Sequence, residues 1–306
     1  MITASAPGKI ILFGEHAVVY GRPAIAVPVT QVQATATIRP GGQGIIIQSI
    51  ETHETIALDR AGPNHPLAAI VRLTLKQLGI YTADLSITVR STIPIASGLG
   101  SGAAVSTAIV RALATWANAA LDETAVNTLV YEIEKLHHGT PSGIDNTVIA
   151  YNRPIYFIKG QPIQTFMVAR PFAVAIGNTG LASPTKIAVG DVRMNWEADQ
   201  DQYEARFDQI GAVVQEARAA LEGGESDQLG PLMDRNQALL RAITVSSPEL
   251  ERLIDAARSA GAAGAKLVGG GRGGNMIALV DESNREVVVA ALKNAGAIST
   301  IVTEVR

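Results

Sequence analysis

A glycine-rich stretch at residues 94–104 has the residue types of an anion-binding loop. It reads Pro-Ile-Ala-Ser-Gly-Leu-Gly-Ser-Gly-Ala-Ala and lies between an expected strand at 85–89 and a helical pattern beginning at residue 101. Its glycines remove side chains that would keep a phosphate from backbone N–H groups, and the helix N-terminus adds unpaired donors. We predict a phosphate-binding loop, with a plain turn as the alternative. The predicted binding residues are Pro94, Ala96, Ser97, Gly98, Leu99, Gly100, Ser101, Gly102 and Ala103.

Three known phosphate-binding patterns can be compared with this loop. A Walker loop ends in Gly-Lys-Ser/Thr, whereas Gly102 is followed by Ala103. The dinucleotide fingerprint fits Gly98, Gly100 and Ala103 by spacing, but its acidic partner ends a strand, and Asp122 instead opens a helical pattern. The protein-kinase loop is excluded because the chain contains no His-Arg-Asp or Asp-Phe-Gly triplet.

A second glycine run, at residues 269–274, lies between two expected strands. Gly269, Gly271 and Gly274 have the dinucleotide spacing, but the run leads into a strand and not into a helix. Neither dinucleotide binding nor a helix-dipole site follows, and a plain turn is again the alternative. Arg272 could contact phosphate or substrate or face water, and we favour water.

The N-terminal segment 6–21 places Lys9, Glu15 and His16 around two glycines. By residue type alone the set is ambiguous, since Lys and Glu are usually surface residues. The five histidines show no His-x-x-x-His or His-Glu-x-x-His spacing, which argues against a zinc hydrolase.

Four segments together resemble the GHMP superfamily of small-molecule kinases. They are residues 6–21, 94–104, 134–146 and 266–274, spread along the whole chain. Gly-Glu-His-Ala-Val-Val-Tyr-Gly and His-Gly-Thr-Pro-Ser-Gly-Ile-Asp-Asn closely resemble the mevalonate kinases of that superfamily, while galactokinases resemble the first only as far as Gly-Glu-His. The last segment departs from the family at Gly270, where Ala is usual. The resemblance implies a two-domain α/β (α+β) fold with its active site in the interdomain cleft.

The resemblance implies transfer of the γ-phosphoryl group of ATP to the 5-hydroxyl of (R)-mevalonate, with Mg²⁺. Asp145 matches the family's proposed catalytic base, and Lys9 matches the lysine beside it. A nearby cation would stabilise a developing alkoxide but weaken the carboxylate as a base. Without the resemblance, Asp145 is interpreted as a helix N-cap after Pro-Ser-Gly.

The metal and substrate residues are also implied by the resemblance. Glu134 matches the family's magnesium ligand, and Ser101 remains as the second candidate because the family's ligand serine is replaced by Gly102. Water and phosphate oxygens would complete the shell of an ion that keeps several waters. The predicted substrate residues are His16, Glu15, Thr185 and Gly271, for which a cap, a surface charge or a helix start are the alternatives.

Hydrophobic periodicity supplies the expected elements. Strands are predicted at 31–38, 45–50, 85–89, 155–158, 172–176, 265–268, 276–280 and 298–305. Helices are predicted at 66–78, 101–120, 196–221, 228–243, 248–260 and 283–295, and another follows a cap at Asp122. We place a domain boundary near 170, between an N-terminal domain 1–170 with the nucleotide loop and base and a C-terminal domain 171–306. The last strand is expected to return to the first domain, as it does in relatives.

Composition further limits the classes of protein to which the chain could belong. The chain has 306 residues, a net charge of −3 and no cysteine. It therefore has no disulfide framework, iron–sulfur cluster or cysteine nucleophile, and it suits a reducing compartment. The charge argues against basic patches for nucleic acid or membranes. We expect a cytoplasmic protein with a small-molecule partner and neither a nucleic-acid nor a membrane partner, with a homodimer as one option.

Two classes of function stay open. The presence of Lys9, Glu134 and Asp145 together favours an active kinase, and the alternative is an inactive relative that binds substrate as a sensor. Among kinases, the rivals are phosphomevalonate, galactose and homoserine kinases.

Overall fold

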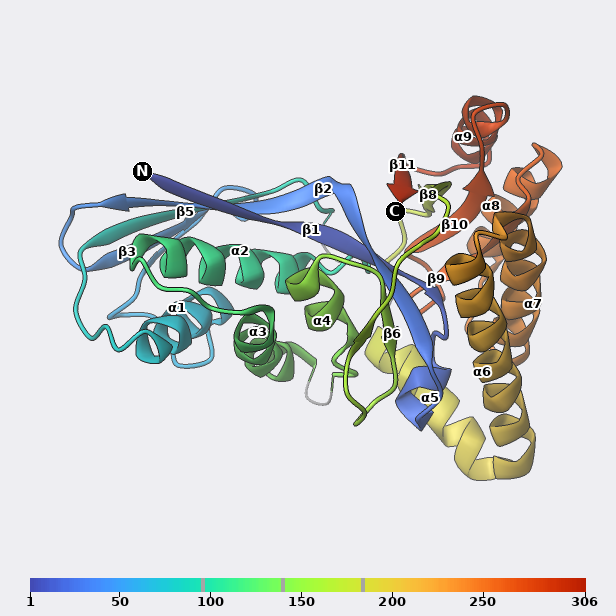
Figure 1. Ribbon diagram of the computed structural model, residues 1–306, viewed down its shortest axis with the longest axis horizontal. Helices are drawn as coiled ribbons and strands as arrows, with labels where there is room; N and C mark the ends of the chain where they lie inside the picture. The colour runs from blue at the N-terminus through green and yellow to red at the C-terminus, as the bar shows by residue number, and fades with distance from the viewer. Residues whose placement is uncertain (95–96, 139–140, 183–184) are drawn as a thin grey trace. The chain divides into compact units, whose positions relative to one another are not determined.

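A computed structural model describes residues 1–94, 97–138, 141–182 and 185–306 (Figure 1). The chain forms two compact units, each built from separate stretches of sequence. The first contains Met1–Lys9, Val32–Pro94 and Leu99–Asn152, and the second contains Ile10–Gln31, Ile95–Gly98 and Arg153–Arg306. A domain boundary near residue 170 stays a prediction.

The first unit is a sheet with helices on one face (Figure 1). Its strands follow the order β4 (Glu54–Ala57), β3 (Ile45–Ser49), β5 (Leu85–Ser91) and β2 (Ala24–Pro40). β3 and β5 are parallel, with Ile47 beside Ile87, and the other pairs are antiparallel. On β2, Val32, Ala34, Ala36 and Ile38 are buried, as the alternating pattern at 31–38 predicts.

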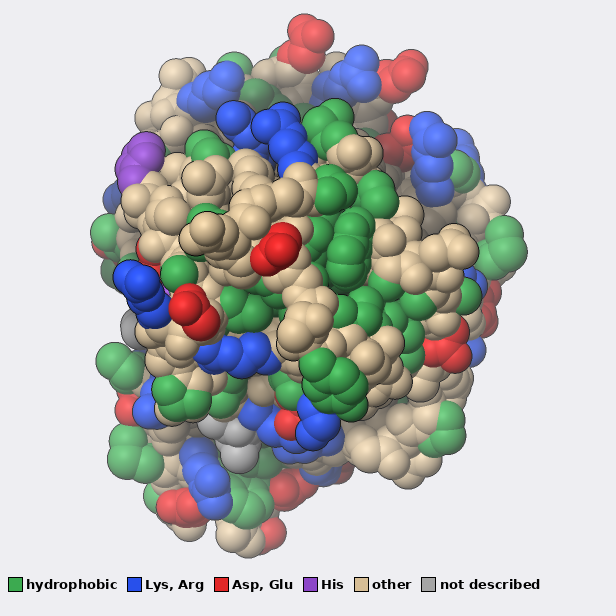
Figure 2. All heavy atoms as spheres, turned by 90° about the vertical axis from the view of Figure 1, so that its left-hand side faces the viewer, with side chains coloured by type: hydrophobic (Ala, Val, Ile, Leu, Met, Phe, Trp, Pro, Cys, Tyr) green, Lys and Arg blue, Asp and Glu red, His purple; other side chains and the backbone are tan. Residues whose placement is uncertain are grey.

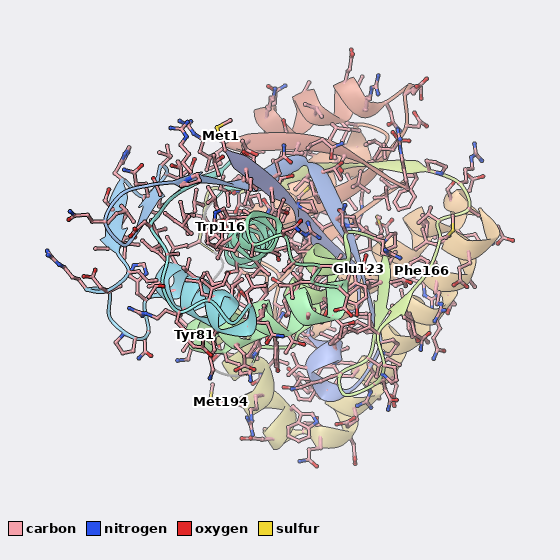
Figure 3. All side chains as sticks on the ribbon, turned by 60° about the vertical axis from the view of Figure 1, so that its left-hand side comes forward. Met1, Tyr81, Trp116, Glu123, Phe166 and Met194 are labelled. Carbon is pink, nitrogen blue, oxygen red and sulfur yellow. The ribbon has the colours of Figure 1, made fainter. Side chains whose placement is uncertain are left out.

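Four helices cover this sheet: α1 (Pro66–Gln77), α2 (Ser101–Trp116), α3 (Glu123–His138) and α4 (Ile144–Tyr151). α2 contacts the other three, and its many alanines allow that close packing. Figure 3 marks Trp116 at its C-terminal end. The predicted cap of α3 is confirmed, because Asp122 Oδ1 accepts a hydrogen bond from the Ala125 N–H at 2.7 Å.

The second unit contains a four-stranded antiparallel sheet in the order β11 (Ser299–Val305), β8 (Phe172–Asn178), β10 (Asn275–Val280) and β9 (Gly264–Val268). The expectation that the last strand returns to the first domain is wrong. β11 pairs with β8, Ile301 beside Ile176, and buries Thr303 and Val305. In the same unit, residues 24–26 of β2 pair with β6 (Ile155–Phe157), which pairs with β7 (Gln164–Thr165). β1 (Ile2–Phe13) pairs with β2.

The helices of the second unit are α5 (Thr185–Ala198), α6 (Gln200–Gly223), α7 (Leu229–Ala242), α8 (Pro248–Ser259) and α9 (Arg285–Asn294), with short 3₁₀ turns at Ala17–Tyr20 and Ser226–Gln228. The single helix predicted at 196–221 is wrong at its start. A break at Asp199, which caps α6 by accepting from the Gln202 N–H at 3.2 Å, separates α5 from α6. α5 buries only Ala188 and Val192, too few for a clear apolar stripe.

The surface is mixed in charge where Figure 2 shows it. Lys and Arg side chains are interspersed there with Asp and Glu. No helix in the described ranges combines the length and apolar character needed to cross a bilayer.

Candidate active site

Lys9 and Asp145 form an ion pair in the first unit. Lys9, on β1, is buried, and its Nζ lies 2.9 Å from Asp145 Oδ1. The N-cap of α4 is Gly143, with a φ of 89°, so Asp145 lies in the first turn and the N-cap alternative is wrong. There the positive end of the helix and the ammonium group both attract the carboxylate. Asp145 is therefore held by charge and remains partly open to solvent.

The first turn of α4 is fixed to α3 through Asn127. Its Oδ1 accepts hydrogen bonds from Asn146 Nδ2 at 2.5 Å and from the Thr147 hydroxyl at 3.4 Å. The Thr147 hydroxyl also donates to the Gly143 carbonyl at 2.6 Å. The backbone that carries Asp145 is therefore anchored on both sides of that residue.

Glu134, on α3, is buried beside the Lys9–Asp145 pair. Burial, and then the negative charge of Asp145, raise the pKa of its carboxyl to about 7, while Lys9 opposes the change. A Cβ added at Gly102 would lie 3.8 Å from Glu134 Oε1 and within 4 Å of no other group outside its helix and chain neighbours. The three residues predicted for chemistry, Lys9, Asp145 and Glu134, are thus brought together.

Gly100 allows Lys9 to lie against the start of α2. Gly100 is the N-cap with a φ of 76°, and a Cβ there would be 2.7 Å from Ile149 Cδ1 and 3.0 Å from Lys9 Cγ. The Lys9 N–H donates to the Leu99 carbonyl at 3.0 Å. The N-cap residue Gly100 has no side chain to bond to the first N–H groups of this helix, which suits them to a ligand.

The remaining loop residues divide between the two units. Ser97 and Gly98 belong to the second unit, where Asn275 Nδ2 donates to the Ser97 carbonyl at 2.5 Å. A Cβ at Gly98 would meet no atom of the described residues within 4 Å. Ala96 lies outside the described residues.

These residues fit a magnesium nucleotide. An uncapped helix N-terminus suits phosphate, and the open space at Gly102 faces the oxygen of a buried carboxylate. Glu134 and Ser101 are the protein groups that would hold the metal. Within the described segments, no three His, Cys, Asp or Glu side chains gather at one point.

In the second unit, Glu15 and His16 follow Gly14 at the end of β1. A Cβ at Gly14, whose φ is 100°, would lie 2.5 Å from the Pro23 carbonyl oxygen, so only glycine fits. The buried Glu15 carboxylate forms an ion pair with the buried Lys266 ammonium. His16 Nε2 lies 3.1 Å from the Gly270 carbonyl oxygen, and burial chiefly lowers the pKa of this imidazole to about 4.

The loop between β9 and β10 packs closely on its neighbours. A Cβ at Gly270 would lie 2.7 Å from Thr185 Oγ1, and one at Gly271 would lie 2.0 Å from the Val245 carbonyl oxygen. The predicted substrate residues His16, Thr185 and Gly271 therefore meet around this loop. Arg272, which we expected to face water, is 28% exposed and also pairs with the carboxylate of Asp191 on α5.

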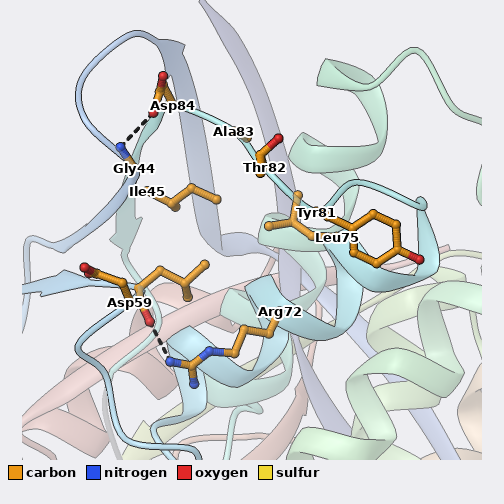
Figure 4. Close-up of a pocket in the computed structure, with 10 residues that line it drawn as sticks. Gly44, Ile45, Asp59, Arg72, Leu75, Tyr81, Thr82, Ala83 and Asp84 are labelled. Carbon is orange, nitrogen blue, oxygen red and sulfur yellow. Dashed lines mark hydrogen bonds between the residues drawn. The ribbon is translucent and has the colours of Figure 1, made fainter.

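A hollow of about 580 Å³ in the first unit contains none of the predicted site residues (Figure 4). Tyr81 and Asp84 are among the residues that line it, and Asp84 accepts a hydrogen bond from the Gly44 N–H at 2.7 Å. Arg72 donates to backbone carbonyls, including that of Leu58 at 2.5 Å. These bonds stabilise the loops that line the hollow.

The sequence interpretation missed Asn127, Lys266 and Asn236, whose Nδ2 donates to Glu15 Oε2 at 3.4 Å. Lys266 opens the last of the four segments and lies in the otherwise apolar strand β9. A lysine in such a strand is itself a signal, since Lys is almost never buried without a partner. Asn127 and Asn236 had no comparable signal.

The chain is similar to known kinases over almost its full length. The model described as GHMP kinases N terminal domain matches residues 64–153, and that described as GHMP kinases C terminal matches residues 217–298. The mevalonate kinase of Pyrococcus abyssi is 34% identical, covering 97% of this chain and 93% of that protein. The mevalonate kinase of Pyrococcus horikoshii is 35% identical, covering 98% and 94%. The crystal structure of L. major mevalonate kinase in complex with R-mevalonate matches with a TM-score of 0.87 and 28% identity, covering 99% and 95%.

Proposed function

The chain belongs to the GHMP kinase family, and we propose that it catalyses ATP-dependent phosphorylation of the 5-hydroxyl of (R)-mevalonate to 5-phosphomevalonate. The two matching family models and the similar mevalonate kinase structure confirm the resemblance to the GHMP superfamily and the expected mixed α/β fold. The observation that carries the proposal is the cluster of Lys9, Asp145 and Glu134, in a chain about one-third identical to mevalonate kinases. The reaction is the first kinase step of the mevalonate route to isoprenoids.

The nucleotide is assigned to the loop and first turn of α2. Backbone N–H groups of Leu99–Ala103 would bind phosphate oxygens, and Glu134 and Ser101 would hold Mg²⁺. When bound, Mg²⁺ neutralises phosphate charge during transfer. Burial raises the pKa of Glu134 to about 7, so this carboxyl would have to give up its proton to hold a metal ion at pH values below about 7.

Asp145 is assigned to the reacting hydroxyl. It orients the 5-hydroxyl and accepts its proton as the oxygen forms a bond to the γ-phosphorus and ADP leaves. Lys9 lies 2.9 Å from the carboxylate and stabilises negative charge on the oxygen. The same cation weakens Asp145 as a base, so orientation and charge stabilisation supply the larger part of the effect.

The substrate contacts are assigned to His16, Thr185 and Gly271, with Glu15 beside them. The His16 imidazole is neutral at physiological pH because its pKa is lowered to about 4. It therefore offers one hydrogen-bond donor and one acceptor and no charge.

The test is an ADP-release assay in which mevalonate, phosphomevalonate, galactose and homoserine are supplied separately with Mg-ATP. We expect the highest kcat/KM with mevalonate. Faster turnover of another acceptor would contradict the proposal. Mevalonate binding without ADP release from any acceptor would establish the alternative of an inactive sensor.

We further propose that the protein is cytoplasmic, binds neither nucleic acid nor membranes, and forms a homodimer. The absence of cysteine and the net charge of −3 support the first two statements. Light scattering during size-exclusion chromatography tests the third, and a monomer mass at micromolar concentration would contradict it.

A further inference from the structure

His16 is held in an unusual backbone conformation. Its φ is 61° and its ψ is −50°, and the Ala17 N–H donates to the Glu15 carbonyl at 2.7 Å. This is a γ-turn with its central residue at positive φ, the rarer and strained form of that turn. Such conformations persist only where the surrounding structure over-determines them. Some contact must therefore hold this turn.

The residue before His16 provides that contact. The Glu15 and Lys266 side chains are 1% and 0% exposed and pair directly. Lys266 Nζ also donates to the Leu267 carbonyl at 2.7 Å, and Asn236 Nδ2 donates to Glu15 Oε2 at 3.4 Å. Burial raises the pKa of Glu15 and lowers that of Lys266, and each charge opposes the change in its partner. The turn is thus tied to β9 and α7.

The same pair fixes both sides of the His16–Gly270 hydrogen bond. Glu15 immediately precedes His16, and Lys266 lies in the strand that leads into Gly270. A carbonyl oxygen only accepts, so Nε2 must carry the proton and Nδ1 must be the acceptor. Nδ1 is buried and has no hydrogen-bond partner among the residues that the structure describes. The pair therefore sets where this acceptor lies.

We propose that Glu15 and Lys266 are positioning residues, which hold the γ-turn so that His16 keeps one tautomer and one orientation for a hydroxyl group of the substrate. Glu15 then acts on the substrate through His16 and not by contact. The choice of substrate rests on the proposed function, but the tautomer and orientation of His16 can be measured without it.

The test uses two variants. The double variant carries both Glu15→Met and Lys266→Met and so removes both charges. The single variant Glu15→Gln keeps a hydrogen-bond acceptor at residue 15. Ring ¹⁵N–¹H NMR reports the His16 tautomer, with the signal assigned through His16→Gln. In the parent protein we expect the Nε2–H tautomer from pH 8 to about pH 5, given a pKa of about 4. In the double variant we expect mixed tautomers and a KM for mevalonate about tenfold or more higher, with kcat and the KM for ATP within about threefold. Glu15→Gln should show smaller changes in the same direction.

The control is the double variant Asp234→Asn with Arg258→Met. Asp234 Oδ1 accepts hydrogen bonds from Arg258 Nη2 at 2.5 Å and from the Ala265 N–H at 3.0 Å, so it anchors the same strand through bonds that do not include Glu15 or His16. We expect unchanged His16 signals and KM, whatever happens to its melting temperature. Equal effects in the control, or unchanged His16 signals and KM in a folded Glu15/Lys266 variant, would overturn the proposal. If the double variant does not fold, Glu15→Gln decides. If the parent protein does not phosphorylate mevalonate, the proposed function fails, and the NMR result still decides the role of the pair.

Discussion

Each unit contains one lysine–carboxylate pair at its predicted site, and the two differ in access to water. In the first unit, the Asp145 side chain is 32% exposed while its partner Lys9 is buried. In the second unit, Glu15 and Lys266 are at most 1% exposed. Both pairs join a lysine ammonium to a carboxylate, and they differ in what surrounds them.

Access decides what each pair can do. A partly exposed carboxylate can meet an incoming hydroxyl and exchange a proton with it. A sealed pair meets no ligand, and its attraction mainly offsets the cost of removing two charges from water. Lys9 and Asp145, the open pair, are therefore suited to chemistry. Glu15 and Lys266, the sealed pair, are suited to holding the backbone in place.

The largest expected effect is on the open pair. Asp145→Asn should lower kcat by roughly 10²- to 10⁴-fold, the range of a positioned acid–base group, with little change in melting temperature. Asp122→Asn is the matched control, since Asn also caps helices and Asp122 only caps α3. Steady-state kinetics with thermal unfolding checks both variants. A kcat of Asp145→Asn close to that of the parent protein would contradict a catalytic role for the open pair.

The sealed pair should respond in stability. Lys266→Met leaves a buried, unpaired Glu15 and should lower the free energy of unfolding by about 3–5 kcal/mol. Lys9→Met leaves Asp145, which water reaches, and should lower it by less than about 1 kcal/mol while reducing kcat. Urea unfolding of both variants decides. Equal losses of stability would mean that exposure does not separate the two pairs.

Local pattern predicted the elements well where one segment carried enough information. α1 and the cap of α3 follow from apolar spacing and from Asp122. α5 was missed because most of its surface is exposed, so that it has almost no apolar stripe. The prediction that the last strand, β11, returns to the first domain was wrong. β11 pairs with residues more than a hundred positions away, and residue spacing within one segment does not encode such a pairing.

The site residues, like the helices and strands, were predicted where a local motif identified them and missed where packing decides. Motif resemblance predicted Lys9, Glu134 and Asp145, and the structure brings them together. Glu15 and His16 were also singled out, but not the strained turn centred on His16 or the role of Lys266. Burial of that lysine depends on what packs around β9, and this is a property of the folded chain rather than of any segment.

Glu134 sharpens the comparison, because it is a buried carboxylate next to the open pair. Its pKa is raised to about 7 from 4.5, so the protonated form is favoured in the folded state. Its contribution to stability is fully present below pH 4.5 and is lost as the pH rises through about 7. That difference corresponds to about 3 kcal/mol.

Glu134→Gln has no titrating carboxyl at residue 134, so its stability should lack this pH-dependent contribution. Relative to the variant, the metal-free parent protein should lose about 3 kcal/mol of unfolding free energy between pH 4.5 and pH 8. Urea unfolding across that range measures it. Parallel pH profiles would show that water reaches Glu134 more freely than its burial indicates.

Gly100 tests how closely the open pair depends on the helix start. Gly100→Val places a branched side chain at a φ of 76°, against Ile149 and Lys9. We expect a loss of about 2 kcal/mol in stability and a higher KM for ATP. Gly98→Ala is the comparison, because the φ of Gly98 is 81° but a Cβ there meets no atom of the described residues within 4 Å. A KM for ATP unchanged in Gly100→Val would remove this loop from the nucleotide site.

The smallest effect should come from an ion pair open to water on both sides. Arg235 and Glu216 have side chains 52% and 49% exposed, with Nη1 2.6 Å from Oε2. Both ions keep most of their hydration, so the pair gains little on forming, and salt screens that gain. Arg235→Met with Glu216→Gln should change the unfolding free energy by less than about 1 kcal/mol and leave kcat and KM as they were. A loss comparable with that of Lys266→Met would mean that pairing itself, and not burial, determines the cost of breaking these contacts.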